Sequence, residues 1–167
     1  MDEQWLVDLQ QTLHREMPIC AAMDIAVTSC DRPFQEGPRL HDGGRLAMGM
    51  PLAPNRNHQD SAFAGSLNAL CTVVGWGAMF LLLEQQGMSG NIVIRRGNIR
   101  YRRPVRLPYI VARSLPLDRD AVDYFYELLR SKEKSKLDVA VEIVDGQGPL
   151  VTFQGSYVVQ SGSGLDL

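Results

Sequence analysis

An uncharged run at residues 61–83 restricts the fold of this chain more than any other feature. About 20 uncharged residues can span a bilayer, but this run contains three glycines and several polar side chains, and no basic cluster flanks it. A helix that is apolar on all sides otherwise lies in the core of a larger fold. We therefore expect a core helix and no membrane contact, with apolar stripes at Leu67, Leu70, Val74 and Leu81 and at Ala69, Val73, Trp76 and Phe80.

Length, charge and cysteine content narrow the class of protein. The 167 residues fit one domain, which we expect over residues 1–160, followed by a flexible tail over residues 161–167. The formal charge of −2 gives no general attraction to nucleic acid or to an anionic membrane. The three cysteines form no Cys-x-x-Cys pair near histidines, so neither disulfides nor a metal site are expected. Because the N-terminus lacks the pattern of a signal peptide, we expect a cytoplasmic protein.

Period-two alternation on both sides of the central helix predicts strands. Two of them flank the turn at residues 145–149 and form a predicted hairpin. Two more helices are expected at residues 2–16, ending before Pro18, and at residues 120–130. The strand residues are Met23, Ile25 and Val27; Leu46, Met48, Met50 and Leu52; Ile92, Ile94, Ile99 and Tyr101; Tyr109, Val111 and Leu115; Leu137, Val139, Val141 and Ile143; and Val151, Phe153, Tyr157 and Val159.

The third of these strands requires an irregularity. Ile92 and Ile94 occupy even positions, whereas Ile99 and Tyr101 occupy odd ones. All four face the core only if one residue is absorbed between them, and Gly97 is the predicted β-bulge.

The order of elements predicts an α+β architecture. One antiparallel six-stranded sheet wrapped around one long helix gives that helix apolar partners on all sides, an arrangement called the hotdog fold. An open sheet of this kind leaves an edge to be covered. We therefore expect at least a homodimer, or a homotetramer, with a ligand site at the subunit contact.

The residues at the start of the central helix carry a family resemblance. Residues 57–65, Asn-His-Gln-Asp-Ser-Ala-Phe-Ala-Gly, resemble the Asn-x-x-Gly-x-x-His-Gly-Gly signature of hotdog acyl thioesterases. The longer stretch APNRNHQDSAFAGSLNAL, with the later GWG, is similar to the thioesterase domain at the C-terminus of YiiD-like proteins, over about residues 18–159. In those proteins an acetyltransferase domain often precedes it, and the chain before Pro18 is too short for one, so we expect a stand-alone copy.

Four positions depart from the family pattern. Asp60 stands where many hotdog thioesterases have glycine, and residues 63–64 stand where they have His-Gly. Thr72 stands where one branch of the family places a catalytic aspartate on the helix. The mechanism of those enzymes is therefore not transferred directly to this chain.

Hydrolysis of an acyl thioester, which the resemblance implies, needs donors for an oxyanion, a base for water and a dry acyl tunnel. Backbone N–H groups near Ala64 and Gly65 lie at the positive end of the helix and are the expected donors. Asn57 either donates its amide to the same carbonyl or fixes the loop. Asp60, the nearest carboxylate, is the first candidate for the base, and His58 is the second.

Structural roles compete with each of these assignments. Asp60 or Ser61 would serve equally well as a helix cap, and His58 as a solvated side chain. Thr72 either bonds back to its own helix or orients water in the acyl pocket. Asn68 is expected to be buried in the same helix and therefore to have a hydrogen-bond partner. Cys71 fits a small buried apolar residue rather than a nucleophile.

An arginine-rich segment, RRGNIRYRRPV, follows the central helix. Strand alternation places Arg100 and Arg102 on the face opposite to Ile99 and Tyr101. Guanidinium groups bind phosphate in a bidentate way, so we expect Arg96, Arg100 and Arg102 to bind the phosphates of coenzyme A or of the phosphopantetheine of an acyl carrier protein. The alternative is a solvated strand face paired with Asp138 or Glu142.

Three function classes remain open at this stage. An acyl thioesterase comes first, with coenzyme A or phosphopantetheine as part of the substrate and no further cofactor. A dehydratase or hydratase of the same fold needs a histidine facing a carboxylate, and only His14, His41 and His58 are available. A non-catalytic acyl-binding or oligomerisation domain is favoured by the loss of the helix carboxylate at Thr72.

Overall fold

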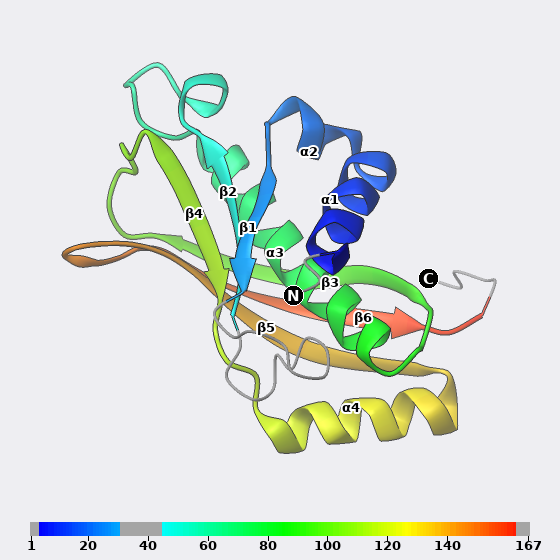
Figure 1. Cartoon of the computed structure of the whole chain (residues 1–167). Coiled ribbons are helices and arrows are strands. Elements are labelled where there is room, and N and C mark those ends of the chain that lie inside the picture. Colours follow the sequence, from blue (N-terminus) through cyan, green and yellow to red (C-terminus); the bar gives the residue numbers. More distant parts are fainter. Residues whose placement is uncertain (1–3, 31–44, 163–167) are drawn as a thin grey trace.

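One twisted antiparallel sheet wraps around a long helix in the computed structural model (Figure 1). The structure describes residues 4–30 and 45–162, so His41, residues 2–3 of the first predicted helix and residues 163–167 of the predicted tail lie outside it. The elements are α1 (Gln4–Glu16), α2 (Pro18–Ala22), β1 (Ala26–Cys30), β2 (Leu46–Pro51), the 3₁₀ turn η2 (Ala53–Asn55), α3 (Ala64–Gln85), β3 (Asn91–Tyr101), β4 (Tyr109–Ser114), α4 (Arg119–Lys132), β5 (Lys134–Asp145) and β6 (Gly148–Gln160).

The sheet of the described chain has the strand order β1-β2-β4-β5-β6-β3, and every pairing is antiparallel. In Figure 1, β5 and β6 run across the view, whereas β4, β2 and β1 run nearly perpendicular to them. This twist curves the sheet around α3, which contacts β2, β3, β4, β5 and β6. The six strands and the central helix predicted from the sequence are therefore confirmed. Four residues predicted to lie in strands do not: Met23 and Ile25 precede β1, and Leu52 and Leu115 follow β2 and β4.

The helix α3 is buried on all sides but one. It is long and apolar enough to cross a membrane, and 67% of its most apolar window is buried inside the protein, as in a core helix. One stripe remains open: Asn68 is exposed, and Thr72, Trp76 and Phe80 are half-buried. The expectation that Asn68 is buried with a partner is therefore wrong, and complete burial of the helix is wrong along this stripe.

Close contact between β6 and α3 sets their relative position. The fully buried Tyr157 donates its hydroxyl hydrogen to the backbone oxygen of Thr72 at 2.7 Å. Its ring and hydroxyl occupy the space that a side chain at Gly75 would need. Two residues later, Met48 and Leu46 of β2 fill the corresponding space at Gly77. The two glycines thus bring opposite parts of the sheet onto the helix backbone.

The predicted bulge in β3 exists at another position. Ile94 pairs with Tyr157 and Arg96 pairs with Ser156, so the absorbed residue is Arg95. Gly97 lies in regular pairing with Gly155, directly against the ring of Phe153. The glycine is therefore needed for packing and not for the change of register.

The two edges of the sheet differ. At the β1 edge, the side chain of Gln10 makes the hydrogen bonds that a neighbouring strand would make. Its Oε1 accepts from the N–H of Val27 at 2.5 Å, and its Nε2 donates to the backbone oxygen of Ile25 at 3.1 Å. At β3, no other described element hydrogen-bonds to the outer edge. An uncovered edge of 11 residues is a surface for pairing with another chain.

Sequence reasoning missed the short helix α2. Pro18 ends α1 as predicted, but it also occupies the first turn of α2, where its missing N–H is harmless. The last helix, α4, is slightly longer than predicted because Asp118 caps it by accepting from the N–H of Ala121 at 2.9 Å.

Replacing Gly75 by Ala is expected to lower the free energy of unfolding by about 1–3 kcal/mol, because the added methyl group displaces the Tyr157 ring. Denaturant unfolding measures the loss. Gly146→Ala is the control, since nothing lies within 4 Å of its added methyl group, and we expect a change within about 0.5 kcal/mol. Equal stabilities for the two variants would contradict this account of the contact.

Candidate functional site

A tight loop at residues 56–62 leads into α3, and Asn57 holds it together. Arg56 and Ala62 form an isolated antiparallel bridge. The Oδ1 of Asn57 accepts from the N–H groups of Gln59 at 2.9 Å and Ser61 at 3.2 Å, and its Nδ2 donates to Ser61 Oγ at 3.0 Å. The side chain of Asn57 therefore has the loop-fixing role that the sequence left open.

Asn55 is a site residue that sequence reasoning missed. It is 2% exposed, and its Nδ2 donates to the backbone oxygens of Met23 and Pro51, both at 2.9 Å. Its own backbone oxygen accepts from the N–H of Phe63 at 2.7 Å. Asn55 thus links three places: its side-chain amide bonds the ends of α2 and β2, and its backbone oxygen bonds the residue before α3. Its only signal in the sequence is its place beside Pro54.

The first turn of α3 has no cap. Phe63 is the N-cap residue and offers no side-chain hydrogen bond. The alternative that Asp60 or Ser61 caps this helix is therefore wrong. The backbone N–H groups of Ala64, Gly65 and Ser66 have no acceptor among the described residues. Three free donors at the positive end of a 22-residue helix form an anion-binding position.

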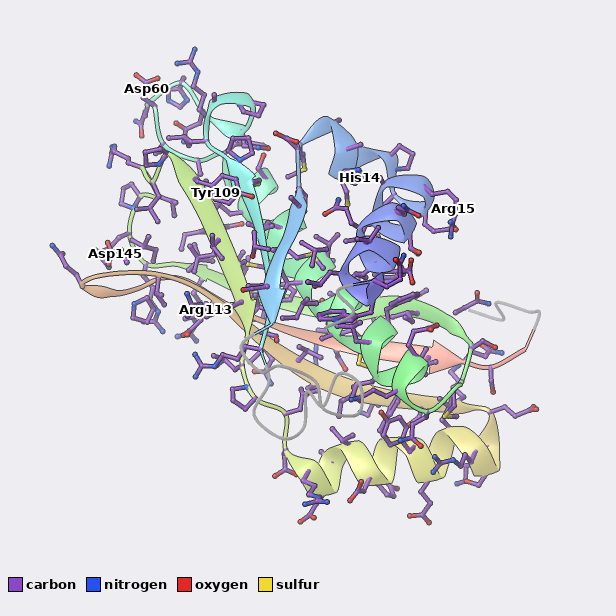
Figure 2. All side chains as sticks on the ribbon, viewed as in Figure 1. His14, Arg15, Asp60, Tyr109, Arg113 and Asp145 are labelled. Atoms are coloured by element: carbon purple, nitrogen blue, oxygen red, sulfur yellow. The ribbon has the colours of Figure 1, made fainter. Side chains whose placement is uncertain are left out.

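Asp60 and His58 lie at the exposed tip of this loop. Asp60 has a left-handed backbone with φ of 55°, and its Oδ1 lies 3.2 Å from Arg56 Nη1. Figure 2 shows Asp60 at the outer end of the loop, directed away from the sheet. Its side chain is 82% exposed. Within one subunit, the nearest partner of this carboxylate is a solvated arginine.

Tyr101 connects the end of β3 to the start of α3. Its hydroxyl donates to the backbone oxygen of Ala64 at 3.0 Å. Partial burial raises the pKa of Tyr101 above its usual value, so the hydroxyl stays protonated and remains a donor. The uncapped turn and the last residue of β3 are therefore neighbours. Sequence reasoning gave no sign of this contact.

A pocket of about 730 Å³ opens along the exposed stripe of α3. Its walls come from the end of α1, from Trp76 and Phe80 of α3, and from Ile92 and Ile94 in the first half of β3. The two aromatic rings stack with centroids 5.4 Å apart. A mostly apolar pocket of this size, with polar groups at its rim, suits a small apolar ligand.

Thr72 lines this pocket. No hydrogen bond to its hydroxyl is found in the described part of the chain, so the bond back to its own helix is absent and the pocket-facing position is the one observed. The adjacent Cys71 is buried, and burial raises the pKa of its thiol to about 12. A protonated, buried thiol is not a nucleophile.

The arginines of β3 lie on the outer face of the sheet. Ile99 and Tyr101 pair with the buried Phe153 and Val151, whereas Arg96 and Arg100 project to the other side together with Asn98. Arg96, Arg100 and Arg102 are exposed and form no ion pair with any described residue, so the predicted direct pairing with Asp138 or Glu142 is not observed.

Arg103, in contrast, has a structural role. Its two terminal nitrogens bond both carboxylate oxygens of Asp145, at 2.8 Å and 3.0 Å. The hydrogen bonds from Arg103 hold the pKa of Asp145 below its usual value. Asp145 lies at the tip of the β5–β6 hairpin (Figure 2), so this pair ties the hairpin turn to the end of β3.

The histidines of the described chain do not face carboxylates. His14 of α1 bonds through Nε2 to the backbone oxygen of Ile25 at 2.8 Å. His58 is exposed and has no hydrogen bond or ion pair to a described carboxylate. A paired histidine and carboxylate, as a hydratase needs, is therefore absent from the part of the chain that the structure describes.

Solved structures share this architecture. A putative thioesterase from Shewanella oneidensis is 27% identical, with 95% of this chain and 99% of that chain covered and a TM-score of 0.74. A protein of unknown function from Chlorobaculum tepidum is 24% identical over 96% of both chains, with a TM-score of 0.82. Thioesterase HI1161 from Haemophilus influenzae is 14% identical, with 97% and 94% covered and a TM-score of 0.60.

These similarities confirm the predicted hotdog fold. The likeness to the Haemophilus and Chlorobaculum proteins supports the fold alone, because their identity to this chain is low. A family model described as "Putative thioesterase (yiiD_Cterm)" matches residues 6–161, nearly the whole chain, and the resemblance noted in the sequence is confirmed. The chain therefore belongs to the YiiD_C family, a group of thioesterase-like hotdog proteins.

Proposed function

We propose that this protein hydrolyses an acyl thioester carried by coenzyme A or by an acyl carrier protein. The observation that carries the proposal is the uncapped first turn of α3, where three consecutive N–H groups are free. A carbonyl oxygen that binds there gains stabilisation as negative charge develops on it, from donors and a helix dipole that are already in position. Gly65 has no side chain, and the ring of Phe63 lies in the space beside it.

Asp60 is the proposed base. Its carboxylate takes a proton from water, and the resulting hydroxide forms a bond to the carbonyl carbon. The carbon–sulfur bond then breaks, and the protonated Asp60 returns the proton to the departing sulfur, which releases acid and thiol. In one subunit Asp60 is paired with Arg56, so it acts once the substrate or a second subunit displaces that partner. His58 is the second candidate for the base. Thr72 faces the pocket, and its hydroxyl is proposed to orient the attacking water.

The active form is proposed to be at least a dimer formed through β3. The strand has an open edge, and three large apolar side chains near it are exposed: Phe63 by 55%, Tyr101 by 46% and Ile94 by 37%. Antiparallel pairing of two β3 strands about a twofold axis places the first half of one strand beside the second half of the other.

This pairing would join the two halves of the site. The apolar pocket borders the first half of β3, at residues 91–94. The first turn of α3 is tied to the last residue of β3 through the Tyr101–Ala64 hydrogen bond. The pocket of one subunit therefore faces the partner's first turn, and the acyl chain of a thioester bound at that turn enters the pocket of the other subunit.

The carrier phosphates are proposed to bind Arg100 and Arg102, with Arg96 further along the strand. Arg100 and Arg102 flank Tyr101 in the chain but project from the opposite face of the sheet, so the pantetheine arm would pass round the end of β3 to reach them. None of the three arginines forms an ion pair with a described carboxylate, although Glu142 lines the same hollow as Arg100 and Arg102, and Asp138 lines that of Arg96. Unpaired guanidinium groups at a surface suit phosphate oxygens.

A non-catalytic acyl-binding domain is the second candidate, favoured by Thr72, which offers no carboxylate on the helix. A screen of acyl-coenzyme A and acyl-carrier thioesters with a thiol-release dye separates the two. Release of thiol supports hydrolysis, whereas retention of the acyl thioester without release supports a binding domain.

Replacing Asp60 by Asn is expected to lower kcat by about 10²–10⁴-fold, the typical contribution of a general base. Thermal unfolding should change little because the side chain is 82% exposed. Arg56→Gln, which removes only the ion-pair partner, is the matched control and should keep its turnover. Near-normal hydrolysis by a folded Asp60→Asn protein would move the base to His58 or Thr72.

Replacing Asn57 by Asp separates the two roles of that side chain. The new carboxylate still accepts from the N–H groups of Gln59 and Ser61, but the donor at Nδ2, which bonds Ser61 Oγ and the Ala62 oxygen, is lost. If the amide contributes to the oxyanion site, kcat falls by about 10²–10³-fold, whereas the melting temperature falls only by the loss of these loop contacts. A loss of activity only in Asn57→Ala, which also breaks the loop contacts, would leave Asn57 a purely structural residue.

Replacing Arg100 and Arg102 together by Ala is expected to raise KM for a coenzyme A thioester, with thermal stability nearly unchanged. Removal of charge-assisted contacts to phosphate weakens binding of the carrier more than it slows the chemical step. Arg119→Ala, an exposed arginine on α4, is the control for net charge. An unchanged KM would indicate a solvated strand face instead.

The oligomeric state is tested by light scattering at micromolar concentration, where we expect a mass of at least two chains. Ile94→Glu introduces a charge beside the open edge and should shift the equilibrium toward monomer. A monomeric wild-type protein would refute the shared site.

A further inference from the structure

Phe63 lies directly over the proposed thioester position. A side chain built on Gly65 would collide with the ring of Phe63. The ring therefore occupies the space beside the backbone of Gly65, next to one of the three free N–H donors. No other described side chain comes this close to that glycine.

The backbone of Phe63 is fixed, whereas its ring is open to the surroundings. Its N–H donates to the buried Asn55 at 2.7 Å, and its backbone oxygen accepts from Leu67 at 3.1 Å in the first helical hydrogen bond. The side chain makes no cap and is 55% exposed. A large aromatic ring at this open position contributes little to the core and is free to contact a ligand.

The geometry of a thioester defines what the ring would touch. When the carbonyl oxygen accepts a hydrogen bond from the N–H of Gly65, the α-carbon and the sulfur are both one bond from the carbonyl carbon. A thioester whose acyl side is turned toward Phe63 would place its α-carbon against the ring. The sulfur carries no further substituent except the carrier arm, whereas the α-carbon is where acyl groups differ in branching.

We propose that Phe63 determines specificity at the α-carbon of the acyl group: its ring admits an unbranched α-carbon and excludes an α-methyl branch. This inference rests on the proposed function, because it places the carbonyl at the first turn of α3. Phe63 contacts the substrate but transfers no proton and makes no covalent bond. The substrate class is thus narrowed to acyl thioesters that carry two hydrogens on the α-carbon.

The test uses ketone analogues of an acyl-pantetheine thioester, in which a methylene group replaces the sulfur so that nothing is hydrolysed. One analogue carries an unbranched acyl group and the other carries an α-methyl group, and calorimetry gives the two dissociation constants. Wild-type protein should bind the unbranched analogue at least about tenfold more tightly, the discrimination expected for one excluded methyl group. Phe63→Ala should bind the two within about twofold, and Phe63→Leu should lie between.

Ile19→Ala is the matched control. Ile19 is also a large apolar residue, 60% exposed, on α2 and outside the site. Its replacement should leave the ratio of the two dissociation constants unchanged. Circular dichroism of each variant confirms that it is folded, which is expected because neither side chain belongs to the core.

The results of these binding experiments test the role of Phe63 separately from the proposed hydrolysis. Unchanged discrimination in Phe63→Ala, equal binding of the two analogues by wild type, or no binding of either one would overturn the role of Phe63. Hydrolysis of thioesters with a branching preference that Phe63→Ala retains would leave the proposed function intact and still overturn the inference. Discrimination that depends on Phe63, without turnover of any thioester, would support the inference and refute hydrolysis.

Discussion

The burial of α3 against the sheet is the interaction on which the rest of the structure depends. The hydroxyl of Tyr157 reaches the helix backbone because Gly75 has no side chain, and Met48 and Leu46 reach it at Gly77 for the same reason. These contacts fix the rotation of the helix about its own axis. Residues spaced by four lie on one face of a helix, so Thr72, Trp76 and Phe80 are turned together toward the side that the sheet leaves open. The pocket is thus a consequence of where the glycines stand.

At its N-terminus, α3 lacks the stabilisation that a capping side chain would give. A serine, aspartate or asparagine at the N-cap typically contributes about 1 kcal/mol, and two such residues, Asp60 and Ser61, stand just before the helix. Neither bonds to it. Ser61 instead interacts with Asn57, Asp60 interacts with Arg56, and an exposed phenylalanine occupies the cap. The loop is fixed internally, while no described residue accepts from the N–H groups of the first turn.

The sequence predicted the fold well because its strongest signals are local. The uncharged run and the alternating strands each follow from burial of one stretch of chain, and the six strands and the central helix came out as expected. The position of the bulge was predicted wrongly. Gly97 is the obvious residue for an irregularity, but Phe153 packs on it from the neighbouring strand, and Arg95 is absorbed because its exposed side chain loses nothing by leaving the ladder.

The candidate site was harder to predict than the fold, because its parts meet only through long-range contacts. The loop at residues 56–62 and the positive end of the helix were recognisable from residue types alone. The hydrogen bond from Tyr101 to Ala64, the triple role of Asn55 and the ring of Phe63 over Gly65 depend on the register between β3, η2 and α3. Asn68 and Trp76 were assigned to the interior because composition cannot tell which stripe of an apolar helix the sheet leaves uncovered.

The open stripe and the open edge have one physical origin. A six-stranded sheet of this curvature covers α3 from β2 to β3 and stops there, so the last strand lacks a neighbour and the helix lacks a cover along the same side of the molecule. Without a further cover on the stripe and the edge, the side chains of Trp76, Phe80, Ile94 and Tyr101 stay partly exposed to water. A second copy that pairs with β3 would cover the edge and the stripe in a single step, and it would do so by bringing its own uncapped helix start to the pocket. In the proposed dimer, one contact would thus meet both the requirement for a partner and the requirement for a dry acyl site.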